Sequence, residues 1–333
     1  MQVCVVYGDG IGREVVPAAV SVLEALLPDV DILYAEAGAA VYRRTGVALP
    51  EETLQKARQA KTVIFGATSN FDEDYLPPIV QLRRDMQTYT NLRPARYLPV
   101  PTSRPGVDLI VVRENTEDLY VGQETEEDYG NRIVAQKVIT RGATQRAAEY
   151  AYKLAIEDGR HKVTIVTKAN VLPQSDGLFR RVALEVAANY PEIETDELLV
   201  DTAAYWMVKE PTRFDLILTP NLYGDILSDM AAAWGGGIGL APSLNIGEGV
   251  AIAEPVHGSA PDIAGQGVAN PTASILSVAM LLRHHWKKRR EAQLVEDAVR
   301  AALTDGLYTS DVHAQDSVST EAFTERVISK LRK

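Results

Sequence analysis

Cysteine is almost absent from the 333-residue sequence, which contains only Cys4. An intrachain disulfide and a cysteine-rich zinc site are therefore excluded, and a reducing, cytoplasmic compartment is expected. Cys4 lies in an apolar run, where the role of a small buried hydrophobic residue is favoured over that of a nucleophile. No run approaches the roughly 18 apolar residues that span a bilayer, and residues 1–7 lack the pattern of a secretory signal.

Positive charge is also scarce, with 34 lysines and arginines against 45 aspartates and glutamates and a net charge of −11. Nucleic acids and anionic membranes attract an excess of basic residues, so neither is an expected partner. The basic run at residues 285–290 could contact RNA, but a solvated helix end is favoured. A local cluster can still bind a small anion, because net charge says little about one cleft.

Short apolar runs alternate with amphipathic stretches along most of the chain. Residues 14–27 and 144–157 have apolar side chains at helical spacing, the second opening on Thr144 and closing at Asp158-Gly159. Between such stretches, runs rich in β-branched residues or leucine predict strands buried on both faces. These strands are residues 3–7, 31–34, 62–65, 108–112, 163–166 and 215–218. The alternation indicates an α/β protein with a largely parallel sheet.

Residues 121–141 interrupt this alternation. Residues 123–128 form a polar, acidic segment, and residues 133–140 then alternate in the manner of an exposed strand. A hairpin or arm that projects from the body of the protein is the structure this pattern predicts.

Glycines are concentrated directly after the first predicted strand, in Gly8-Asp9-Gly10-Ile11-Gly12. At the start of a helix they could admit a phosphate group. The spacing is G-x-G-x-G, however, and a dinucleotide fingerprint is G-x-G-x-x-G with an acidic residue after a second strand. On this evidence a phosphate cradle and a simple tight turn both remain open.

Three arginines, Arg83, Arg93 and Arg113, occur in the strings QLRRD, TNLRPAR and VVRENTEDLY. A guanidinium group suits a carboxylate because two N–H donors match two oxygens. Arg113 ends a predicted strand, where parallel sheets build their clefts. Spacing alone nevertheless favours three surface arginines over a binding site.

Two aspartates, Asp225 and Asp229, lie four residues apart in NLYGDILSDM. On a helix both carboxylates would share one face, where two like charges are unfavourable unless a cation joins them. Oxygen ligands of this kind select Mg²⁺ or Mn²⁺. A solvated acidic helix face is the equally weighted alternative.

The run from Glu254 to Asn270 is the strongest single signal. Glycines, prolines and small residues form a long loop with exposed backbone amides, and such loops are usually functional. Within it, Asp262 could accept hydrogen bonds from a ribose diol, as acidic residues do in other dinucleotide sites.

Taken together, these strings resemble the β-decarboxylating dehydrogenases, a family that includes isocitrate, 3-isopropylmalate, homoisocitrate and D-malate/tartrate dehydrogenases. The matching motifs, in order between residue 8 and about residue 271, are GDGIG, NLRP, VRENTEDLY, TKANVL, NLYGDILSD, GLAPSLNIG and EPVHGSAPDIAG. The resemblance implies an isopropylmalate-dehydrogenase-like fold, a non-classical Rossmann arrangement of two α/β domains with a central sheet. Residues 1–88 and 237–333 would form a large NAD-binding domain, and residues 89–236 a small domain whose arm near 121–141 clasps a partner.

The resemblance also implies roles for individual residues. The arginines that match Arg83, Arg93 and Arg113 bind the carboxylates of a malate in similar enzymes. The residues that match Tyr120 and Lys168 are the acid–base pair, in which the lysine takes the hydroxyl proton and the tyrosine reprotonates carbon.

A divalent metal, Mg²⁺ or Mn²⁺, is implied by the carboxylates that match Asp201, Asp225 and Asp229. In similar enzymes the equivalents of Lys168 and Asp201 come from the neighbouring subunit. A homodimer with shared active sites is therefore implied, and a tetramer is the larger assembly that stays open.

NAD is the expected cofactor. Family members that use NADP have lysine and tyrosine in place of Asp262 and Ile263, and an aspartate there would repel the 2′-phosphate of NADP. The residues expected to bind NAD are Glu254, His257, Gly258, Ser259, Ala260, Asp262, Ile263 and Asn270.

Substrate choice depends on the residues before Arg83. Isocitrate enzymes of the bacterial type place serine and asparagine where Pro77 and Ile79 stand here. Isopropylmalate enzymes place two leucines at the positions of Ile79 and Val80, so these two residues would form a comparable apolar pocket. A difference of one or two methylene groups in such a pocket discriminates between substrates only about 10–200-fold, so this comparison does not identify the substrate.

Other strings favour homoisocitrate. The run PIVQLRRDM is similar to fungal homoisocitrate enzymes, although bacterial ones place an arginine where Val80 stands. The GAVGGPKW-like run of bacterial isopropylmalate enzymes is replaced by residues 66–71, as it also is in archaeal ones. We favour homoisocitrate, oxidised to 2-oxoadipate for lysine biosynthesis, ahead of 3-isopropylmalate for leucine biosynthesis. Isocitrate is a weaker option, as is D-malate or tartrate, to which QTYTNLRP is similar.

Two hypotheses assign the protein to other functional classes, and the sequence gives them little support. A non-catalytic regulatory subunit of this family would have lost acid–base or metal residues, and all of them are present here. A nucleic-acid-binding protein would need a basic face larger than residues 285–290.

Overall fold

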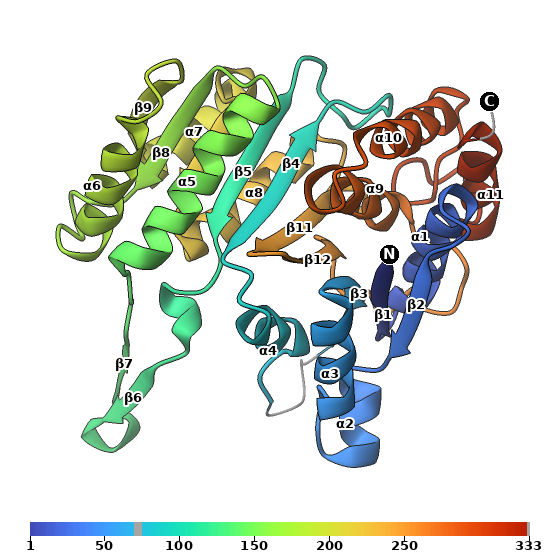
Figure 1. Cartoon of the computed structure of the whole chain (residues 1–333), viewed down its shortest axis with the longest axis horizontal. Helices are drawn as coiled ribbons and strands as arrows, with labels where there is room; N and C mark the ends of the chain where they lie inside the picture. Colours follow the sequence, from blue (N-terminus) through green and yellow to red (C-terminus); the bar gives the residue numbers. More distant parts are fainter. Residues whose placement is uncertain (70–74, 332–333) are drawn as a thin grey trace. The chain divides into compact units, whose positions relative to one another are not determined.

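A computed structural model describes residues 1–69 and 75–331 of the chain (Figure 1). The chain forms two compact units. The first unit contains Met1–Thr88, Tyr97–Pro105 and Ala232–Lys333, and the second contains Tyr89–Arg96 and Gly106–Ala231. Each unit has its own strands and covering helices, and the fold belongs to the α/β class.

The first unit has its strands in the order β2–β1–β3–β12–β11. The first four run parallel and β11 is antiparallel to β12. Their bounds are β1 Gln2–Gly8, β2 Asp31–Ala35, β3 Thr62–Ala67, β11 Pro242–Gly247 and β12 Val250–Pro255. Every residue of β3 is buried, as its run of β-branched and aromatic side chains predicts.

Helices cover both faces of these strands. Helices α1 (Gly12–Leu26) and α9 (Thr272–Met280) contact the strands together with α3 (Glu51–Ala60). Among the described residues, the remaining α-helices of this unit are α2 (Ala39–Thr45), α4 (Pro78–Asp85), α10 (Arg289–Thr304) and α11 (Thr320–Leu331), with a π-helical turn at Leu281–His285. The apolar stripe predicted for residues 14–27 is confirmed, because Val15 and Val22 are fully buried in α1.

The second unit has its strands in the order β4–β5–β10–β8–β9. Strand β4 is antiparallel to β5, and the other neighbours are parallel. Their bounds are β4 Thr90–Arg96, β5 Asp108–Glu114, β8 Lys162–Thr167, β9 Glu194–Leu199 and β10 Leu216–Thr219. The parallel order positions the carboxyl ends of β5, β8 and β10 along one edge, which is where α/β sheets build their sites.

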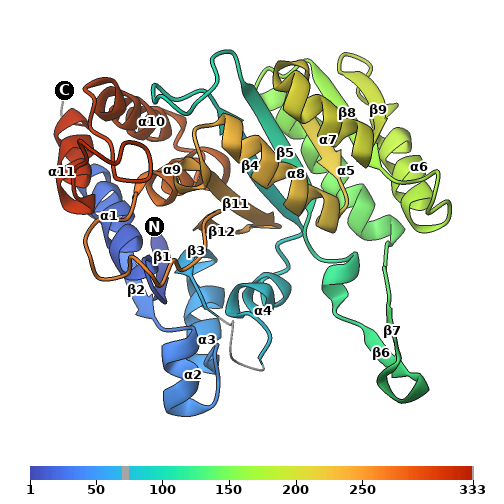
Figure 2. The ribbon, with the colours of Figure 1, turned by 180° about the vertical axis from the view of Figure 1, so that it is seen from behind.

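Four helices cover the second unit. Helices α5 (Arg141–Glu157) and α6 (Ser175–Ala187) lie on one face, and α7 (Val200–Lys209) and α8 (Asn221–Trp234) lie on the other (Figures 1 and 2). Small side chains such as Ala147 and Ala151 are fully buried in α5 and allow this helix to approach the strands closely.

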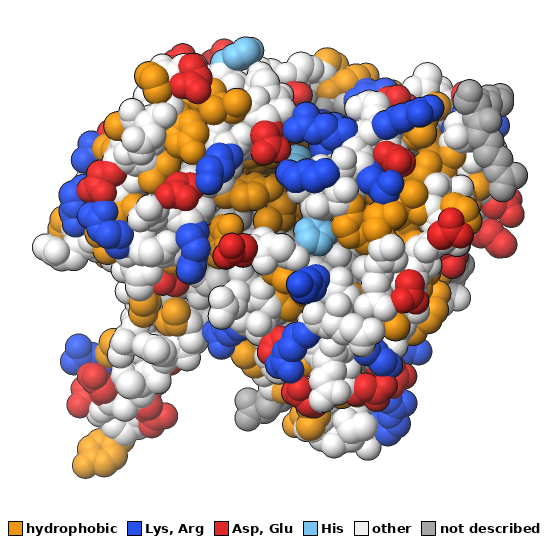
Figure 3. Space-filling model, in the orientation of Figure 1, with side chains coloured by type: hydrophobic (Ala, Val, Ile, Leu, Met, Phe, Trp, Pro, Cys, Tyr) orange, Lys and Arg blue, Asp and Glu red, His pale blue; other side chains and the backbone are white. Residues whose placement is uncertain are grey.

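The predicted arm is confirmed as a hairpin of β6 (Glu124–Glu127) and β7 (Arg132–Ala135), which extends from the second unit (Figure 1). Strand β7 ends earlier than the predicted strand at residues 133–140. Charged side chains lie near the tip of the hairpin (Figure 3). Its turn exposes Tyr129 completely. Tyr129 has a φ of 56°, which a non-glycine residue adopts only at an energetic cost.

Two predictions about single elements are wrong. Residues 31–34 form β2, but β2 is an edge strand, and Tyr34 is 51% exposed where burial on both faces was expected. Helix α5 begins at Arg141, before Thr144, because the side chain of Thr140 accepts a hydrogen bond from the backbone N–H of Ala143 at 3.3 Å. Its predicted end at Asp158-Gly159 is confirmed.

Cys4 is fully buried in β1. Burial raises the pKa of its thiol to about 12, so the side chain stays a neutral, small hydrophobic group as predicted. The helices of the described residues include none with the length and apolar character that crossing a membrane requires.

Helix α4 is held to the first unit by Leu82, which is fully buried in a cluster with Val63, Phe65 and Met86. We expect Leu82→Ala to lower the free energy of unfolding by about 2–5 kcal/mol, because it leaves a cavity in this cluster. Leu76→Ala is the matched control, since Leu76 is 41% exposed. Urea unfolding measures both, and equal losses in the two variants would contradict this account of the core.

Candidate functional site

In the second unit, strand geometry directs two arginines to one face. Arg93 in β4 is paired with Val111 in β5, and Arg113 lies two residues beyond Val111. Because alternate residues of a strand share a face, the side chains of Arg93 and Arg113 project on the same side. That side is covered by helix α8, which follows directly after β10 (Figure 2).

Both arginines bind the aspartates of α8. Arg113 Nη1 lies 2.5 Å from Asp225 Oδ1, and Arg93 Nη1 lies 3.2 Å from that atom and 3.3 Å from Asp229 Oδ1. Arg93 is 9% exposed and Arg113 is 1% exposed. Arg83, in the first unit, is also buried. The surface position that spacing favoured for all three arginines is therefore wrong.

Tyr120 belongs to the same cluster. Its hydroxyl donates a hydrogen bond to Asp225 Oδ2 at 2.6 Å, and the guanidinium of Arg113 lies 4.8 Å from the centre of its ring. Burial raises the pKa of Tyr120, Arg113 opposes this rise, and the hydrogen bond to Asp225 adds to it. The phenol therefore keeps its proton at neutral pH, as a proton donor must.

The donor set of α8 fits a divalent cation. Asp225 and Asp229 direct one carboxylate oxygen each toward a single positive group, Arg93 Nη1. Burial raises the pKa of Asp229; Arg93 opposes the rise and Asp225 adds to it, so a further positive charge would be stabilising here. Carboxylate oxygens are preferred ligands of Mg²⁺ and Mn²⁺.

Lys168 and Asp201 form a separate pair in the second unit. Lys168 directly follows β8 and its ammonium group binds the carboxylate of Asp201, in the first turn of α7. This hydrogen bond lowers the pKa of Asp201. Among residues 1–69 and 75–331, no group of three or more His, Cys, Asp and Glu side chains is arranged to hold a metal ion. Asp201 is thus not brought to Asp225 and Asp229 within the described part of one chain.

In the first unit, Arg83 in α4 forms a buried ion pair with Glu254 at the end of β12. Asn245 in β11 donates a second hydrogen bond to the same Glu254 oxygen at 2.9 Å. Ile79 and Val80 lie one helical turn before Arg83 and are half-buried. The apolar pair and the guanidinium therefore lie on neighbouring positions of one short helix.

The glycine-rich turn after β1 packs against the Glu254–Asn270 loop of the same unit. The carboxylate of Asp9 accepts hydrogen bonds from the backbone N–H groups of Ala39 (2.8 Å) and Ser69 (3.0 Å). The carbonyl of Ser259 accepts one from Ile11 at 2.9 Å and lies where a Cβ on Gly10 would stand. These contacts favour the tight-turn interpretation, because the glycine admits protein backbone.

The rest of this loop offers both buried and accessible groups. His257 is buried, which lowers the pKa of its imidazole, and its ring Nδ1 lies 3.0 Å from the carbonyl of Gly258. The side-chain amide of Asn270 donates to Asp311 at 3.1 Å. Asp262 is exposed. Gly258 is exposed as well, and Ala260 and Ile263 are half-buried.

The amides and the hydroxyl that hold the arginines are not among the site residues predicted from the sequence. Asn221 accepts from Arg113 Nε at 2.8 Å, Asn91 accepts from Arg93 Nε at 2.8 Å, and Ser228 accepts from Arg93 Nη1 at 2.9 Å. All three occur inside the strings NLYGDILSD and TNLRP. Their position beside the charged residues was the available signal.

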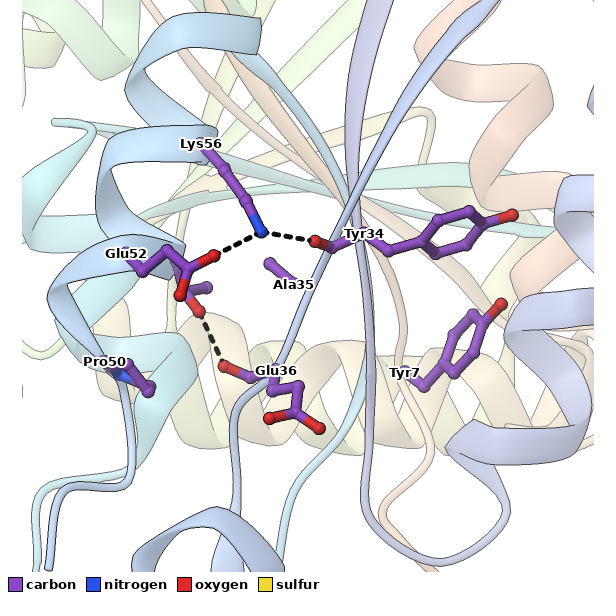
Figure 4. Close-up of a pocket in the computed structure, with 8 residues that line it drawn as sticks. Tyr7, Tyr34, Ala35, Glu36, Pro50, Glu52 and Lys56 are labelled. Atoms are coloured by element: carbon purple, nitrogen blue, oxygen red, sulfur yellow. Dashed lines mark hydrogen bonds and ion pairs between the residues drawn. The ribbon is translucent and has the colours of Figure 1, made fainter. Parts of the chain in front are cut away.

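A pocket of about 490 Å³ lies elsewhere in the first unit, beside β2 and α3 (Figure 4). It is lined by Tyr7, Tyr34, Ala35, Glu36, Pro50, Glu52, Thr53 and Lys56. The ammonium of Lys56 binds Glu52 at 2.7 Å and the carbonyl of Tyr34 at 2.9 Å, so the charge of the pocket is already paired within the protein. None of these eight residues is a predicted site residue.

The model of the isocitrate/isopropylmalate dehydrogenase family matches residues 2–327. The chain belongs to this family. Its members are decarboxylating dehydrogenases that act on small hydroxy acids, require Mg²⁺ or Mn²⁺ and use NAD or NADP. The sequence-based identification of family, fold class and enzyme class is therefore confirmed.

Named relatives within the family differ in substrate. The chain is 48% identical to 3-isopropylmalate dehydrogenase of Methanothermobacter thermautotrophicus, over 94% of this chain and 93% of that protein. It is 46% identical to isocitrate/homoisocitrate dehydrogenase of Thermus thermophilus, over 99% and 98%. The crystal structure of isocitrate dehydrogenase from Methylococcus capsulatus superposes with a TM-score of 0.96 at 39% identity, over 100% of this chain and 99% of that one.

Gly224 in α8 leaves room for Arg113, because a Cβ there would lie 2.6 Å from Arg113 Cγ. We expect Gly224→Ala to displace Arg113 and to lower kcat/KM about 10–100-fold, since misplacement of about 1 Å has effects of that size. Nicotinamide reduction with Mg²⁺ and 3-isopropylmalate or homoisocitrate measures the loss. Gly142→Ala is the control, because a Cβ on Gly142 in α5 meets nothing within 4 Å. Equal activities in the two variants would contradict the role given to Gly224.

Proposed function

We propose that the protein catalyses the oxidative decarboxylation of a 3-substituted D-malate with NAD and Mg²⁺ or Mn²⁺. The observation that carries the proposal is the convergence of Arg93, Arg113 and Tyr120 on Asp225 in the second unit. This convergence supports the proposal, because the reaction needs positive groups for an anionic substrate, carboxylates for a metal and a proton donor close together.

In this proposal Arg83, Arg93 and Arg113 bind the carboxylates of the substrate. Each guanidinium now binds an aspartate or glutamate of the protein, so an incoming carboxylate would replace a partner of the same kind. The exchange keeps every buried guanidinium paired, which avoids the cost of an unpaired buried charge.

Lys168 and Tyr120 are the proposed acid–base pair. Lys168, in its neutral amine form, takes the proton of the substrate hydroxyl as hydride passes to NAD, and Tyr120 returns a proton to carbon after carbon dioxide leaves. The divalent cation, held by Asp201, Asp225 and Asp229, supplies Lewis acidity when it is bound. Tyr120 donates a hydrogen bond to Asp225, so its phenol is in the protonated form that the acid of the pair requires.

A homodimer with shared sites is the proposed assembly, and a tetramer built from it stays open. Support comes from the separation of Lys168 and Asp201 from Asp225 and Asp229 in one chain. Apolar side chains that stay exposed on the arm and on α7 and α8 also support an interface: Tyr129, Ile133, Tyr205, Val208 and Ile226. The arm at residues 121–141 would clasp the partner.

NAD is proposed to bind to the first unit, through the residues of the Glu254–Asn270 loop. Asp262 is exposed, and the residues next to it in the sequence are neither lysine nor arginine. Its negative carboxylate would therefore repel the 2′-phosphate of NADP. Its neighbour Ile263 offers an apolar surface for the cofactor. A cytoplasmic location is proposed from the single, buried cysteine.

Homoisocitrate is the proposed substrate, on the similarity of residues 78–86 to homoisocitrate enzymes and the 46% identity to the Thermus enzyme. 3-Isopropylmalate is the second candidate. The apolar pair Ile79 and Val80, one turn before Arg83, favours it, as does the 48% identity to the Methanothermobacter enzyme. The replaced run at residues 66–71 bears on the same choice, but Asn70 and Phe71 lie outside the described residues.

A single panel tests substrate and cofactor together. NADH and NADPH formation with Mg²⁺ is measured on homoisocitrate, 3-isopropylmalate, isocitrate and D-malate. We expect the highest kcat/KM with homoisocitrate and NAD⁺, because of the motif similarity and Asp262. A higher kcat/KM on 3-isopropylmalate would contradict homoisocitrate as the substrate and would support an apolar pocket at Ile79 and Val80. A preference for NADP⁺ would contradict the role proposed for Asp262. Inactivity on all four acids would favour a regulatory subunit.

Mixed dimers test the sharing of sites. We expect Tyr120→Phe and Lys168→Met each to be inactive, and their mixed dimer to be active, because one of its two sites would contain both intact residues. The dimers are formed by coexpression with two affinity tags, and NADH formation is the measurement. Tyr120→Phe mixed with Asp225→Asn is the control, since these residues contact each other and neither site would be intact. An inactive Tyr120/Lys168 mixture would refute shared sites.

A further inference from the structure

A buried lysine joins the base of the arm to the second unit. Lys137 Nζ lies 3.1 Å from Asp118 Oδ1 and 3.0 Å from Asp176 Oδ1. Both aspartates are completely buried, and the lysine side chain is 13% exposed. The ammonium also lies 4.3 Å from the centre of the Tyr223 ring, which adds a cation–π contact from α8.

The first aspartate shapes the turn that carries Tyr120. Asp118 has φ 71° and ψ −147°, a strained backbone region that is essentially restricted to glycine. Its carboxylate accepts from the backbone N–H groups of Leu119 at 2.8 Å and Leu222 at 2.9 Å. One side chain thus holds both the turn that leads to Tyr120 and the first turn of the helix that carries Asp225.

The second aspartate holds the backbone of Lys168. Asp176 Oδ2 accepts from the N–H of Lys168 at 2.6 Å, while its other oxygen faces Lys137. Asp176 lies in the first turn of α6, which follows the loop after Lys168. Asp176 therefore holds the backbone of Lys168 in place directly after the end of β8.

We propose that Lys137 is a positioning residue that holds both members of the acid–base pair in place, Tyr120 through Asp118 and Lys168 through Asp176. This inference rests on the proposed function, which assigns the pair its chemistry. In a homodimer with shared sites, Lys137 would link the Tyr120 turn of one site to the Lys168 loop that serves the other.

Charge explains why a lysine stands at this position. Burial on its own disfavours the ammonium, but Asp118 and Asp176 outweigh that effect and raise the pKa of Lys137 above its ordinary value. Without the ammonium, two buried carboxylates would lose their shared counter-charge, and each would move toward water or take up a proton. Either response would shift the backbone that the carboxylate holds.

The chain offers a matched control. Lys162 begins β8, the strand that Lys168 follows, and it also binds two carboxylates, Asp196 at 3.0 Å and Glu194 at 3.9 Å. Its side chain is 20% exposed, and neither of these two partners is a proposed catalytic residue. Lys162→Met therefore removes an ion-pair bridge of the same kind at the other end of the strand.

The kinetic test compares Lys137→Met, Lys137→Arg and Lys162→Met with wild type on homoisocitrate and 3-isopropylmalate, with Mg²⁺ and NAD⁺. We expect Lys137→Met to lower kcat about 10–100-fold with little change in KM, because the substrate-binding arginines stay in place. Lys137→Arg should recover part of kcat, and Lys162→Met should keep it. Equal kcat in Lys137→Met and Lys162→Met would overturn the proposal.

Hydrogen exchange gives a readout that needs no substrate. In Lys137→Met we expect faster amide exchange in peptides that cover residues 118–122 and 168–172, and in Lys162→Met we expect wild-type exchange there. Unchanged exchange in Lys137→Met would also overturn the proposal. Inactivity of wild type on both acids would contradict the proposed function alone, because the exchange result would still decide the positioning role.

A variant that fails to fold does not end the test. If Lys137→Met is unfolded by circular dichroism, Asp176→Asn replaces it, because the asparagine oxygen can still accept from Lys168 while its attraction to Lys137 is weakened. We expect lower kcat with little change in KM here as well. Wild-type kcat in folded Asp176→Asn would overturn the link between Lys137 and Lys168.

Discussion

The ion pair between Arg113 and Asp225 is the interaction on which the proposed site depends. Arg113 is almost fully buried, and an isolated guanidinium at such a position would be costly. Asp225 neutralises this charge and also accepts a hydrogen bond from the hydroxyl of Tyr120. Arg93 forms an ion pair with the same carboxylate and with Asp229, which extends the cluster. The positions of the proton donor, the proposed substrate ligands and the proposed metal ligands are thus interdependent.

This interdependence has a consequence for binding. Arginines that now neutralise Asp225 and Asp229 are the groups proposed to bind the substrate, and the two aspartates are the groups proposed to bind the metal. A substrate carboxylate that binds the arginines would leave the two aspartates without a positive partner, which favours binding of a metal. A metal that binds the aspartates would likewise leave the arginines without a negative partner, which favours binding of the substrate. Substrate and metal should therefore strengthen each other's binding, by the reciprocity of linked equilibria.

Local sequence predicts the central strands and the family, but it does not predict the burial of the arginines. Residues 63–65 and 109–112 are apolar throughout, and both lie in buried parts of strands β3 and β5. Strand β4, Thr90–Arg96, has two arginines and a proline and was missed, because pairing with β5 rather than composition makes it a strand. Spacing alone favours a surface position for Arg113, because its partner Asp225 lies 112 residues further along the chain. Long-range partners of this kind are invisible to spacing, and only the family resemblance indicated them.

The most direct test of the account is the affinity of the protein for Mn²⁺, measured by calorimetry with and without D-malate. The account predicts that saturating D-malate tightens Mn²⁺ binding about 5–150-fold, the usual range for coupled sites. It also predicts that Asp225→Asn removes the tight Mn²⁺ site. An affinity for Mn²⁺ that is the same with and without D-malate, or that survives in Asp225→Asn, would contradict the central claim that Arg93, Arg113, Asp225 and Asp229 exchange partners when substrate and metal bind.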